Sequence, residues 1–433
     1  MVRIEREIFF IAALLLLLAP QAEARLQLGE NGPALSGFFE CAWGIKLEDD
    51  TTKRDAYNML EQRLQLQTHI YLESFKLLRK WMAEGHIKGD FTIDEYYSGK
   101  TDFDLRELNI ILSPRAWMDV KLGRQVFTWG TGDYLFVNDL FPKDYVSFYI
   151  GRDDEYLKKP SDGAKLSCYT ESANMDVVII PFFEPSTFFK GDRLSFFDPF
   201  LGGIAARDSD WHVVEPPRQF NNTAYATRLY RTFSSYEVAL YAFRGFYSLP
   251  RGYLDEIHRE LFYPRLDVYG GSVRGPALGG IGNVEWAFYN SRQDSNGDNR
   301  LIPNAMMKYL LGYEKDLGND LKVGIQYLCE QMRHYTHYRG ALHVGDIPED
   351  EYRHLTTLRI TKLYKNQTVK TNVFAFFSPS DMDTYIRLNL DYDVNDHCRF
   401  SVGANLIWGR DDYTEFGQME RNKNIYVRLR YSF

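Results

Sequence analysis

Cysteine is scarce in this sequence, and the cysteines are not clustered. The 433 residues include four Cys, at positions 41, 168, 329 and 398, and no Cys-x-x-Cys pair. This spacing argues against a zinc ribbon and against a dense disulfide framework. There is also no Gly-rich phosphate-binding loop. We therefore predict neither a cofactor nor a metal ion.

Positive charge is not in excess. The chain has 51 Lys and Arg against 59 Asp and Glu, which gives a net charge of −8. A nucleic-acid-binding protein needs a basic stripe or patch. The composition thus predicts no nucleic-acid partner.

Long hydrophobic runs are missing beyond the N-terminus. Residues 8–18 are all apolar, Arg3 and Arg6 precede them, and an Ala-x-Ala cleavage pattern ends at Ala24. We predict a secretory signal peptide over residues 1–24 and one domain over residues 25–433. The apolar run is shorter than the roughly 20 residues that a spanning helix requires.

What the sequence has instead is alternation. Ile425, Val427 and Leu429 alternate with Tyr426 and Arg428, and similar stretches recur along the chain. This period of two predicts β-strands with one apolar and one polar face. The predicted strands are 35–47, 60–72, 86–97, 104–113, 116–128, 163–170, 174–182, 222–233, 235–247, 263–274, 279–290, 304–316, 320–333, 353–364, 367–378, 384–393, 399–408 and 425–433.

Connector lengths distinguish a soluble sandwich from a membrane barrel. Short connectors such as 171–173 and 275–278 alternate with long ones such as 183–221 and 334–352. An up-and-down barrel has short periplasmic turns and long extracellular loops, whereas a Greek-key sandwich has no reason to keep this rhythm. Residues 74–85 interrupt it and fit either a short helix or a longer strand.

We therefore predict an all-β fold, a single transmembrane up-and-down antiparallel β-barrel of 16–18 strands. Closure of the barrel satisfies every backbone hydrogen bond within the membrane. The aromatic content of 15% suits the two belts where a barrel meets the lipid headgroups. The last strand ends in Phe433 and resembles the signal read by the barrel-assembly machinery. The expected location is the outer membrane of a Gram-negative bacterium, with the outer-membrane lipid as a partner.

Several motifs between about Leu105 and Glu285 occur in a characteristic order. They include Leu-Gly-Arg-Gln at 122–125, Trp-Gly at 129–130, and Asn-Asp-x-x-Pro-x-Asp at 138–144. In these motifs the chain resembles the porin-like outer-membrane barrels of Gram-negative bacteria, most of them of unassigned substrate. The resemblance implies a channel for small solutes. Thr131 departs from the acidic or small residue that often follows Trp-Gly in that family.

Arg124 poses a problem for strict alternation. The pattern would point this side chain at lipid, at a cost of roughly 2–4 kcal/mol at the membrane midplane. We predict a β-bulge at Gly123 that turns Arg124 inward and sends Phe127 and Trp129 outward. The alternative is that Arg124 lies high enough in the membrane to reach the headgroups.

The long connector 129–162 is both acidic and aromatic. It carries Asp139 and Asp144 among seven acidic residues, together with Tyr134 and Phe141. So aromatic a segment is not expected to be a free coil. We expect it to fold into the lumen, where its carboxylates pair with lumen arginines and narrow the pore. An outer cap is the alternative.

Charged residues of both signs face the predicted lumen. Arginines concentrate on the closing strands, where they would attract anionic solutes. Asp391 and Asp393 could instead neutralise them in a structural ladder. The candidate pore-lining or binding residues are Arg124, Asp139, Asp144, Arg228, Arg387, Asp391, Asp393, Arg399, Arg428 and Arg430.

The sequence favours a porin without enzymatic activity, through which small hydrophilic or amphiphilic solutes pass. A barrel of this width could also be a structural conduit that sheaths a periplasmic partner such as an electron-transfer protein. An outer-membrane hydrolase is a third possibility. No catalytic residue is proposed.

Overall fold

The structure is a computed structural model that describes residues 26–27, 33–48, 56–72, 80–97, 99–206 and 209–433. The expected signal peptide and most of segment 74–85 lie outside these residues. Within that segment, residues 80–82 form a turn and a strand begins at Glu84. No helix among the described residues is long and apolar enough to cross a membrane.

Antiparallel pairing of neighbouring strands forms a closed barrel of 18 strands. Strands β24 and β2 close it, with Phe38 opposite Ser432 and Lys46 opposite Asn424. The barrel strands are β2 (Ala34–Lys46), β3 (Tyr57–Tyr71), β4 (Glu84–Asp94), β5 (Lys100–Arg115), β6 (Met118–Gln125), β7 (Ser161–Tyr169), β8 (Asn174–Ile180), β12 (Ala224–Phe233), β13 (Tyr236–Phe246), β16 (Arg265–Ala277), β17 (Gly280–Ser291), β18 (Met306–Asp316), β19 (Leu321–Met332), β20 (Tyr352–Tyr364), β21 (Val369–Ser378), β22 (Asp383–Asp393), β23 (Cys398–Gly409) and β24 (Asn424–Ser432).

Smaller elements lie outside the barrel wall. Strand β1 pairs with the start of β2, β9 pairs with β10, and β15 pairs with β11 and β14. Their bounds are β1 (Leu26–Gln27), β9 (Phe196–Asp198), β10 (Gly203–Ala205), β11 (His212–Val214), β14 (Gly252–Asp255) and β15 (Glu260–Phe262). The helical elements are η1 (Glu95–Tyr97), α3 (Tyr145–Ile150), η2 (Asp154–Leu157), η3 (Phe220–Asn222), α4 (Tyr335–Ala341) and η4 (Gly417–Asn422).

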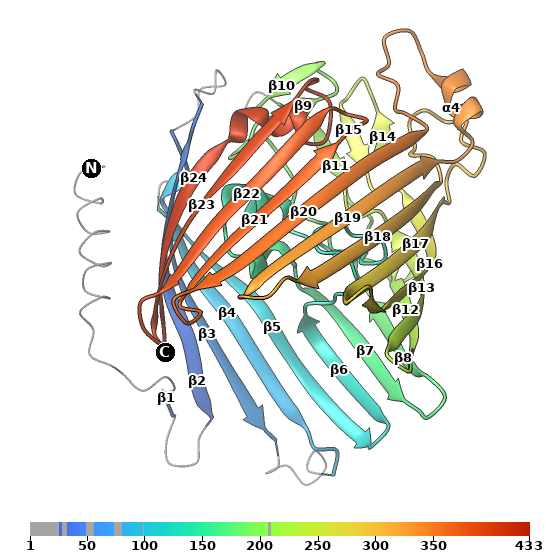
Figure 1. Cartoon of the computed structure of the whole chain (residues 1–433). Helices are drawn as coiled ribbons and strands as arrows, with labels where there is room; N and C mark the ends of the chain where they lie inside the picture. The colour runs from blue at the N-terminus through green and yellow to red at the C-terminus, as the bar shows by residue number, and fades with distance from the viewer. Residues whose placement is uncertain (1–25, 28–32, 49–55, 73–79, 98, 207–208) are drawn as a thin grey trace.

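Each of the predicted wall strands is present, and the alternation of connectors is confirmed. One end of the barrel carries short turns, such as 170–173 and 234–235, and is called the short-turn end below. The other end, called the loop end, carries long connections such as 181–223 and 333–351 (Figure 1). The small strands of the loops have too little alternation to be predicted.

The polarity of the wall is the inverse of a soluble globule. On β24, Ile425 is 40% exposed on the outer face, whereas Arg428 is only 7% exposed on the inner face. Leu240 on β13 and Tyr269 on β16 are likewise half exposed on the outer face. A wide apolar outer surface of this kind requires lipid around it.

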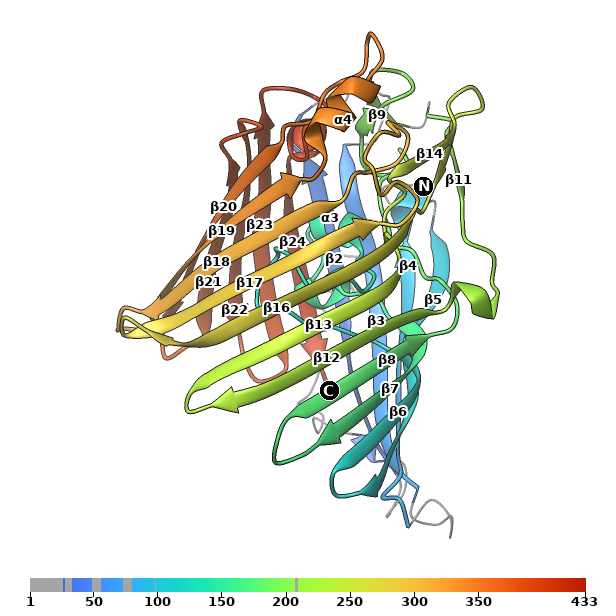
Figure 2. The same ribbon diagram turned by 90° about the vertical axis from the view of Figure 1, so that its right-hand side faces the viewer.

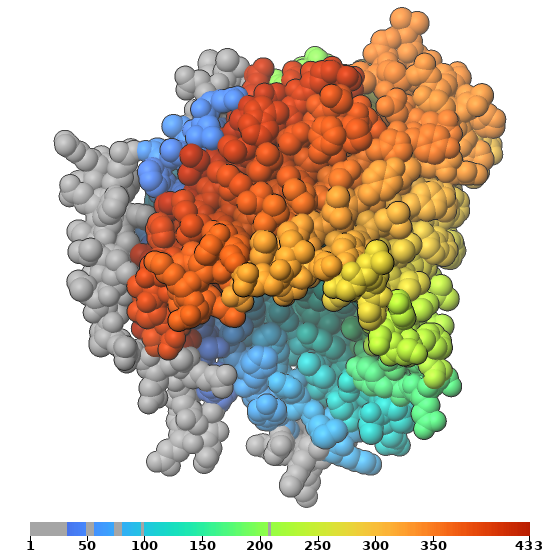
Figure 3. Space-filling view, viewed as in Figure 1, coloured from blue at the N-terminus to red at the C-terminus, as the bar shows by residue number. Residues whose placement is uncertain are grey.

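The rim is uneven at the short-turn end. Strands β3–β6 extend further there than β17–β22 do (Figures 1 and 2). In the space-filling view, the inner side of this longer wall is visible below the short turns of β18–β22 (Figure 3). The rim of the barrel is therefore oblique at the short-turn end.

Candidate functional site

The connection between β6 and β7, residues 126–160, runs inside the barrel and is called the infolded loop. It contains α3 and η2, and Phe148, Tyr149 and Ile150 of α3 are buried. These side chains pack against inward-facing residues of the wall, so the loop fills part of the lumen (Figure 2).

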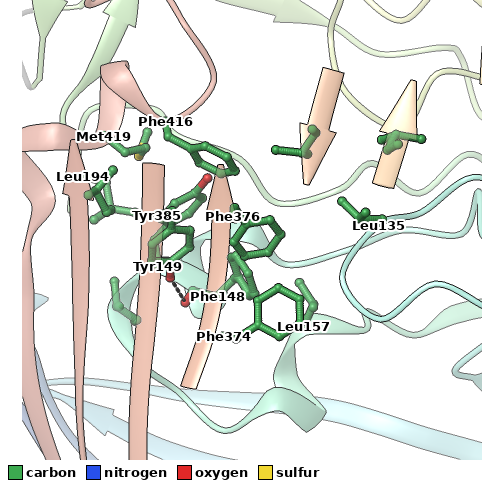
Figure 4. Close-up of a cluster of buried hydrophobic side chains, with 14 of the residues drawn as sticks. Leu135, Phe148, Tyr149, Leu157, Leu194, Phe374, Phe376, Tyr385, Phe416 and Met419 are labelled. Atoms are coloured by element: carbon green, nitrogen blue, oxygen red, sulfur yellow. Dashed lines mark hydrogen bonds between the residues drawn. The ribbon is translucent and has the colours of Figure 1, made fainter. Parts of the chain in front are cut away.

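An apolar cluster holds the infolded loop against β21 and β22. Tyr149 stacks on Tyr385 with 5.1 Å between ring centroids, and Phe148 meets the edge of Tyr385 at 5.6 Å. Phe374 and Phe376 of β21 complete this part of the cluster (Figure 4). Apolar side chains therefore interrupt the predicted polar face of these strands here. The loop brings apolar side chains inward, and burying them requires apolar partners on the wall.

Next to the cluster lie four charged residues, 152–155, which are called the loop tip. Their side chains form ion pairs with several strands of the wall. Arg152 binds Glu61 of β3 through two hydrogen bonds of 2.9 and 2.6 Å. Asp153 accepts hydrogen bonds from Arg428 at 3.1 Å and from Arg430 at 3.2 Å, both on β24. Bidentate and charge-assisted contacts of this kind fix both position and orientation.

Asp154 and Glu155 extend these contacts to both sides. Asp154 accepts a hydrogen bond of 2.9 Å from Arg387 of β22 and another from Tyr134 of the same loop. Glu155 accepts one of 2.9 Å from Lys88 of β4. Carboxylates of the loop therefore pair with lumen cations on strands that lie on either side of the β24–β2 seam.

Aromatic rings of the infolded loop also stack on lumen arginines. Tyr156 lies between two guanidinium groups, 4.2 Å from that of Arg63 and 4.9 Å from that of Arg106. Arg387 lies 4.2 Å from the ring of Phe148. Such contacts are strongest where water is excluded.

Burial and neighbouring charges act in opposite directions on the pKa values of Asp153 and Lys143 in the infolded loop. Burial alone would raise the pKa of Asp153, but Arg428 and Arg430 hold it at about 2. Burial lowers the pKa of Lys143, although Asp139 opposes this shift. Asp153 thus remains charged at neutral pH and available for its ion pairs.

Two of the predicted binding residues, Asp139 and Asp144, accept hydrogen bonds from residues of the infolded loop itself. Asp139 accepts a hydrogen bond of 2.9 Å from Lys143, and the side chains of both are only 3% exposed. Asp144 caps the first turn of α3 by accepting the Ser147 N–H at 3.0 Å. Both aspartates contribute to the shape of the loop.

The structure places the remaining predicted charges on the inner wall. Arg228 binds Glu237 at 2.6 Å, and Arg399 binds Asp393 at 2.6 Å. Asp391 accepts hydrogen bonds from the neutral side chains of Ser401 and Asn389. The structure brings Arg387, Arg428 and Arg430 together around the loop tip, while Arg228 lies away from it on β12.

Arg124 differs from the prediction. Strand β6 keeps a continuous register with β7, and no bulge occurs at Gly123. The shift lies instead on β5, where Glu107 opposes Lys88 and Leu105 opposes Gly89. The bulge at Gly123 and the lumen position of Arg124 are therefore both wrong.

Arg124 lies on the outer face near the loop end of β6, as in the alternative interpretation. Its Nε donates to the Leu105 carbonyl at 2.6 Å, and its Nη1 lies 3.3 Å from Asp162. Phe127 and Trp129 turn inward instead, because both pack on Phe141, with ring centroids 5.3 and 5.1 Å apart.

Some residues of the site were not predicted from the sequence. Arg193, in the loop between β8 and β12, binds Glu61 at 2.8 Å and also pairs with Asp94. Glu40 of β2 accepts a hydrogen bond of 2.9 Å from Arg430. The alternation signals that Glu40 faces inward, but no local pattern indicates where the side chain of a loop residue such as Arg193 ends up.

Comparison with known protein families finds no match, and comparison with curated proteins finds none either. Solved structures do match in fold. OccAB3 of Acinetobacter baumannii has a TM-score of 0.53 at 9% sequence identity, over 92% of this chain and 98% of its own. OccD3 (OpdP) of Pseudomonas aeruginosa has a TM-score of 0.52 at 11% identity, over 94% and 92%. OccK11 (OpdR) of Pseudomonas aeruginosa has a TM-score of 0.51 at 10% identity, over 92% and 95%.

These three proteins are outer-membrane porins, and the fold of this chain is theirs. With its closed wall of antiparallel strands, the molecule has the fold of a porin-type β-barrel.

Proposed function

We propose that the protein is a non-enzymatic outer-membrane channel for the passive passage of small hydrophilic or amphiphilic solutes. The infolded loop narrows its pore. The observation that carries this proposal is the set of ion pairs between the loop tip and three strands of the wall. They join Arg152 to β3, Asp153 to β24 and Asp154 to β22. A loop fixed on several sides reduces the open cross-section of the lumen.

The pairing of the arginines on the closing strands favours anchoring over anion attraction. Arg387, Arg399, Arg428 and Arg430 carry four positive charges, and Asp154, Asp393, Asp153 and Glu40 carry four negative charges within ion-pair distance. The sum is zero. The arginines of the closing strands therefore supply little net field to attract anions.

A sheath around a periplasmic partner is less well supported. The lumen of such a sheath would have to accommodate another chain. In this barrel the infolded loop already packs in the lumen against wall residues such as Phe376, Tyr385 and Leu310. A partner would have to displace these buried contacts, at a cost of about 25 cal/mol for each Å² of apolar surface exposed.

Planar-bilayer recording tests this function. The purified protein should give stepwise ion conductance. A sheath without its partner would conduct no current. A hydrolase would turn over ester or peptide substrates whatever its conductance. The absence of conductance from a folded barrel in the bilayer would contradict the proposal.

A loop replacement tests the narrowing of the pore. Exchanging residues 145–157 for a short Gly-Ser linker should raise the conductance, because this segment makes the contacts across the lumen. The matched control replaces α4, which has no buried residue. Equal conductance of the wild type and the 145–157 replacement would contradict narrowing by the infolded loop.

A further inference from the structure

Two histidines stack on the inner wall, away from the infolded loop's arginine contacts. His69 of β3 and His86 of β4 are directly opposite in register, and their ring centroids lie 4.2 Å apart at an interplanar angle of 14°. His69 shares its strand face with the inward-facing Gln65, and His86 shares its own with the inward-facing Asp90. His69 is two residues from the last residue of β3, so the pair faces the lumen near the short-turn end.

Each imidazole has a carboxylate of its own. His69 Nδ1 lies 3.2 Å from Glu84, and His86 Nδ1 lies 3.2 Å from Glu107. The Lys121 ammonium on β6 lies 3.6 Å from Glu107. His86 Nε2 is buried and has no hydrogen-bond partner among the described residues.

Neighbouring groups complete the surroundings without adding net charge. Asn109 of β5 donates a hydrogen bond to Glu107 at 3.3 Å. Lys88, the next inward residue of β4, is already paired with Glu155 at 2.9 Å. The lumen cluster is therefore defined by His69, His86, Glu84, Glu107 and Lys121.

The formal charge of this cluster depends on the two imidazoles. With both neutral, two carboxylates and one ammonium sum to −1. With both protonated, the sum is +1. Imidazole is the side chain that changes charge between about pH 5 and 8. Each imidazole Nδ1 faces a carboxylate of its own, so the two rings do not share one partner.

We propose that this cluster contributes to the charge selectivity of the lumen at the short-turn end and shifts its preference from cations towards anions as the pH falls. The inference rests on the proposed channel function. A charged wall in a narrow lumen attracts counter-ions, so a change of two charges alters the relative passage of cations and anions.

The test is the K⁺/Cl⁻ permeability ratio, taken from the reversal potential in a KCl gradient across a planar bilayer. In the wild type the ratio should fall about twofold or more between about pH 7.5 and 5.5. The double variant His69→Gln/His86→Gln should keep one ratio at both pH values. The single variant His69→Gln should keep about half of the response. Its side chain is 53% exposed, so the barrel should still fold.

His397→Gln is the matched control. This histidine also lies at the short-turn end, but its Nδ1 faces the main-chain oxygen of Ser432. The control should retain the full pH response. A wild-type channel that conducts with a constant ratio would overturn this inference alone, as would a double variant that responds like the wild type. No current from any folded variant would contradict the channel function itself.

Discussion

Arg428 of β24 and Asp153 of the infolded loop are 275 residues apart in the chain, yet their side chains lie 3.1 Å from each other. Arg430 and Glu40 join the same group, and Glu40 belongs to β2, which closes the barrel against β24. The loop tip is thus attached at the seam of the barrel. The side chains that dock the loop therefore also connect the two strands that close the wall.

Removing the acidic tip should loosen the infolded loop. In Asp153→Asn/Asp154→Asn, Arg428, Arg430 and Arg387 lose charged partners, at a cost of about 1–3 kcal/mol for each partly buried pair. We expect a higher mean conductance and more open-channel noise in single-channel recordings. Asp162→Asn is the control, because Asp162 pairs with Arg124 on the outer face. Unchanged conductance and noise would rule out this anchoring.

The ion pairs of Asp153 predict that strong acid increases channel noise. The pKa of Asp153 is held at about 2 in the folded protein, below the value of about 3.9 of a free aspartate. A depressed folded pKa gives stability that is fully present above the unfolded value and is lost as the pH falls through the folded value. Channel noise should therefore rise between about pH 4 and 2. Measured in the His69→Gln/His86→Gln background, a rise that begins above about pH 5 would contradict this assignment.

The buried Lys143–Asp139 pair gives a test of the motif at 138–144. Lys143→Met leaves the Asp139 carboxylate without its cation, and breaking such a buried pair costs about 3–5 kcal/mol. We expect a lower melting temperature by circular dichroism. Lys143→Met/Asp139→Asn should recover part of the loss, because no unpaired charge then remains. A double variant no more stable than the single one would contradict the pairing.

The alternation of apolar and polar residues was sufficient to predict the strands of the barrel wall. A strand such as β24, with Ile425 facing lipid and Arg428 facing the lumen, carries its orientation in its own sequence. A one-residue change of register would move every apolar side chain to the other face, which makes the register strongly specified. The strand count and the connector rhythm follow from the same pattern.

The interior was predictable only in part. The acidic and aromatic character of the infolded loop predicted its entry into the lumen, but its partners depend on the path of the chain. Arg193 reaches Glu61 from a second loop, and no local pattern encodes that contact. The prediction for Arg124 failed for a different reason. Strict alternation on β6 correctly points this side chain outward, and the bulge at Gly123 was predicted only to keep its charge out of lipid. The Leu105 carbonyl and Asp162 bind the guanidinium on the outer face instead.

Gly270 should be essential for the docking of the loop. A Cβ atom at this position would lie 2.0 Å from Asn138 Oδ1 and 2.5 Å from the main-chain oxygen of Trp286. Gly270→Ala must therefore displace the infolded loop or the wall, at a cost of about 1–3 kcal/mol. We expect a lower unfolding temperature. Gly203→Ala, which has open space around it, is the control. Equal stability of the two variants would show that Asn138 does not dock closely.

The last strand gives a prediction about assembly. Phe433 exchanges two main-chain hydrogen bonds with Gly37, of 2.9 and 3.0 Å, and a change of side chain leaves both intact. We propose that the barrel-assembly machinery binds the aromatic side chain of Phe433. Phe433→Ala should therefore lower the amount of heat-modifiable barrel in the outer-membrane fraction severalfold, whereas Phe433→Tyr should not. Purified Phe433→Ala refolded in detergent should match the wild type in stability, because the closing hydrogen bonds persist. A variant deficient in detergent as well would show a structural role of the side chain, and normal membrane levels would exclude its recognition.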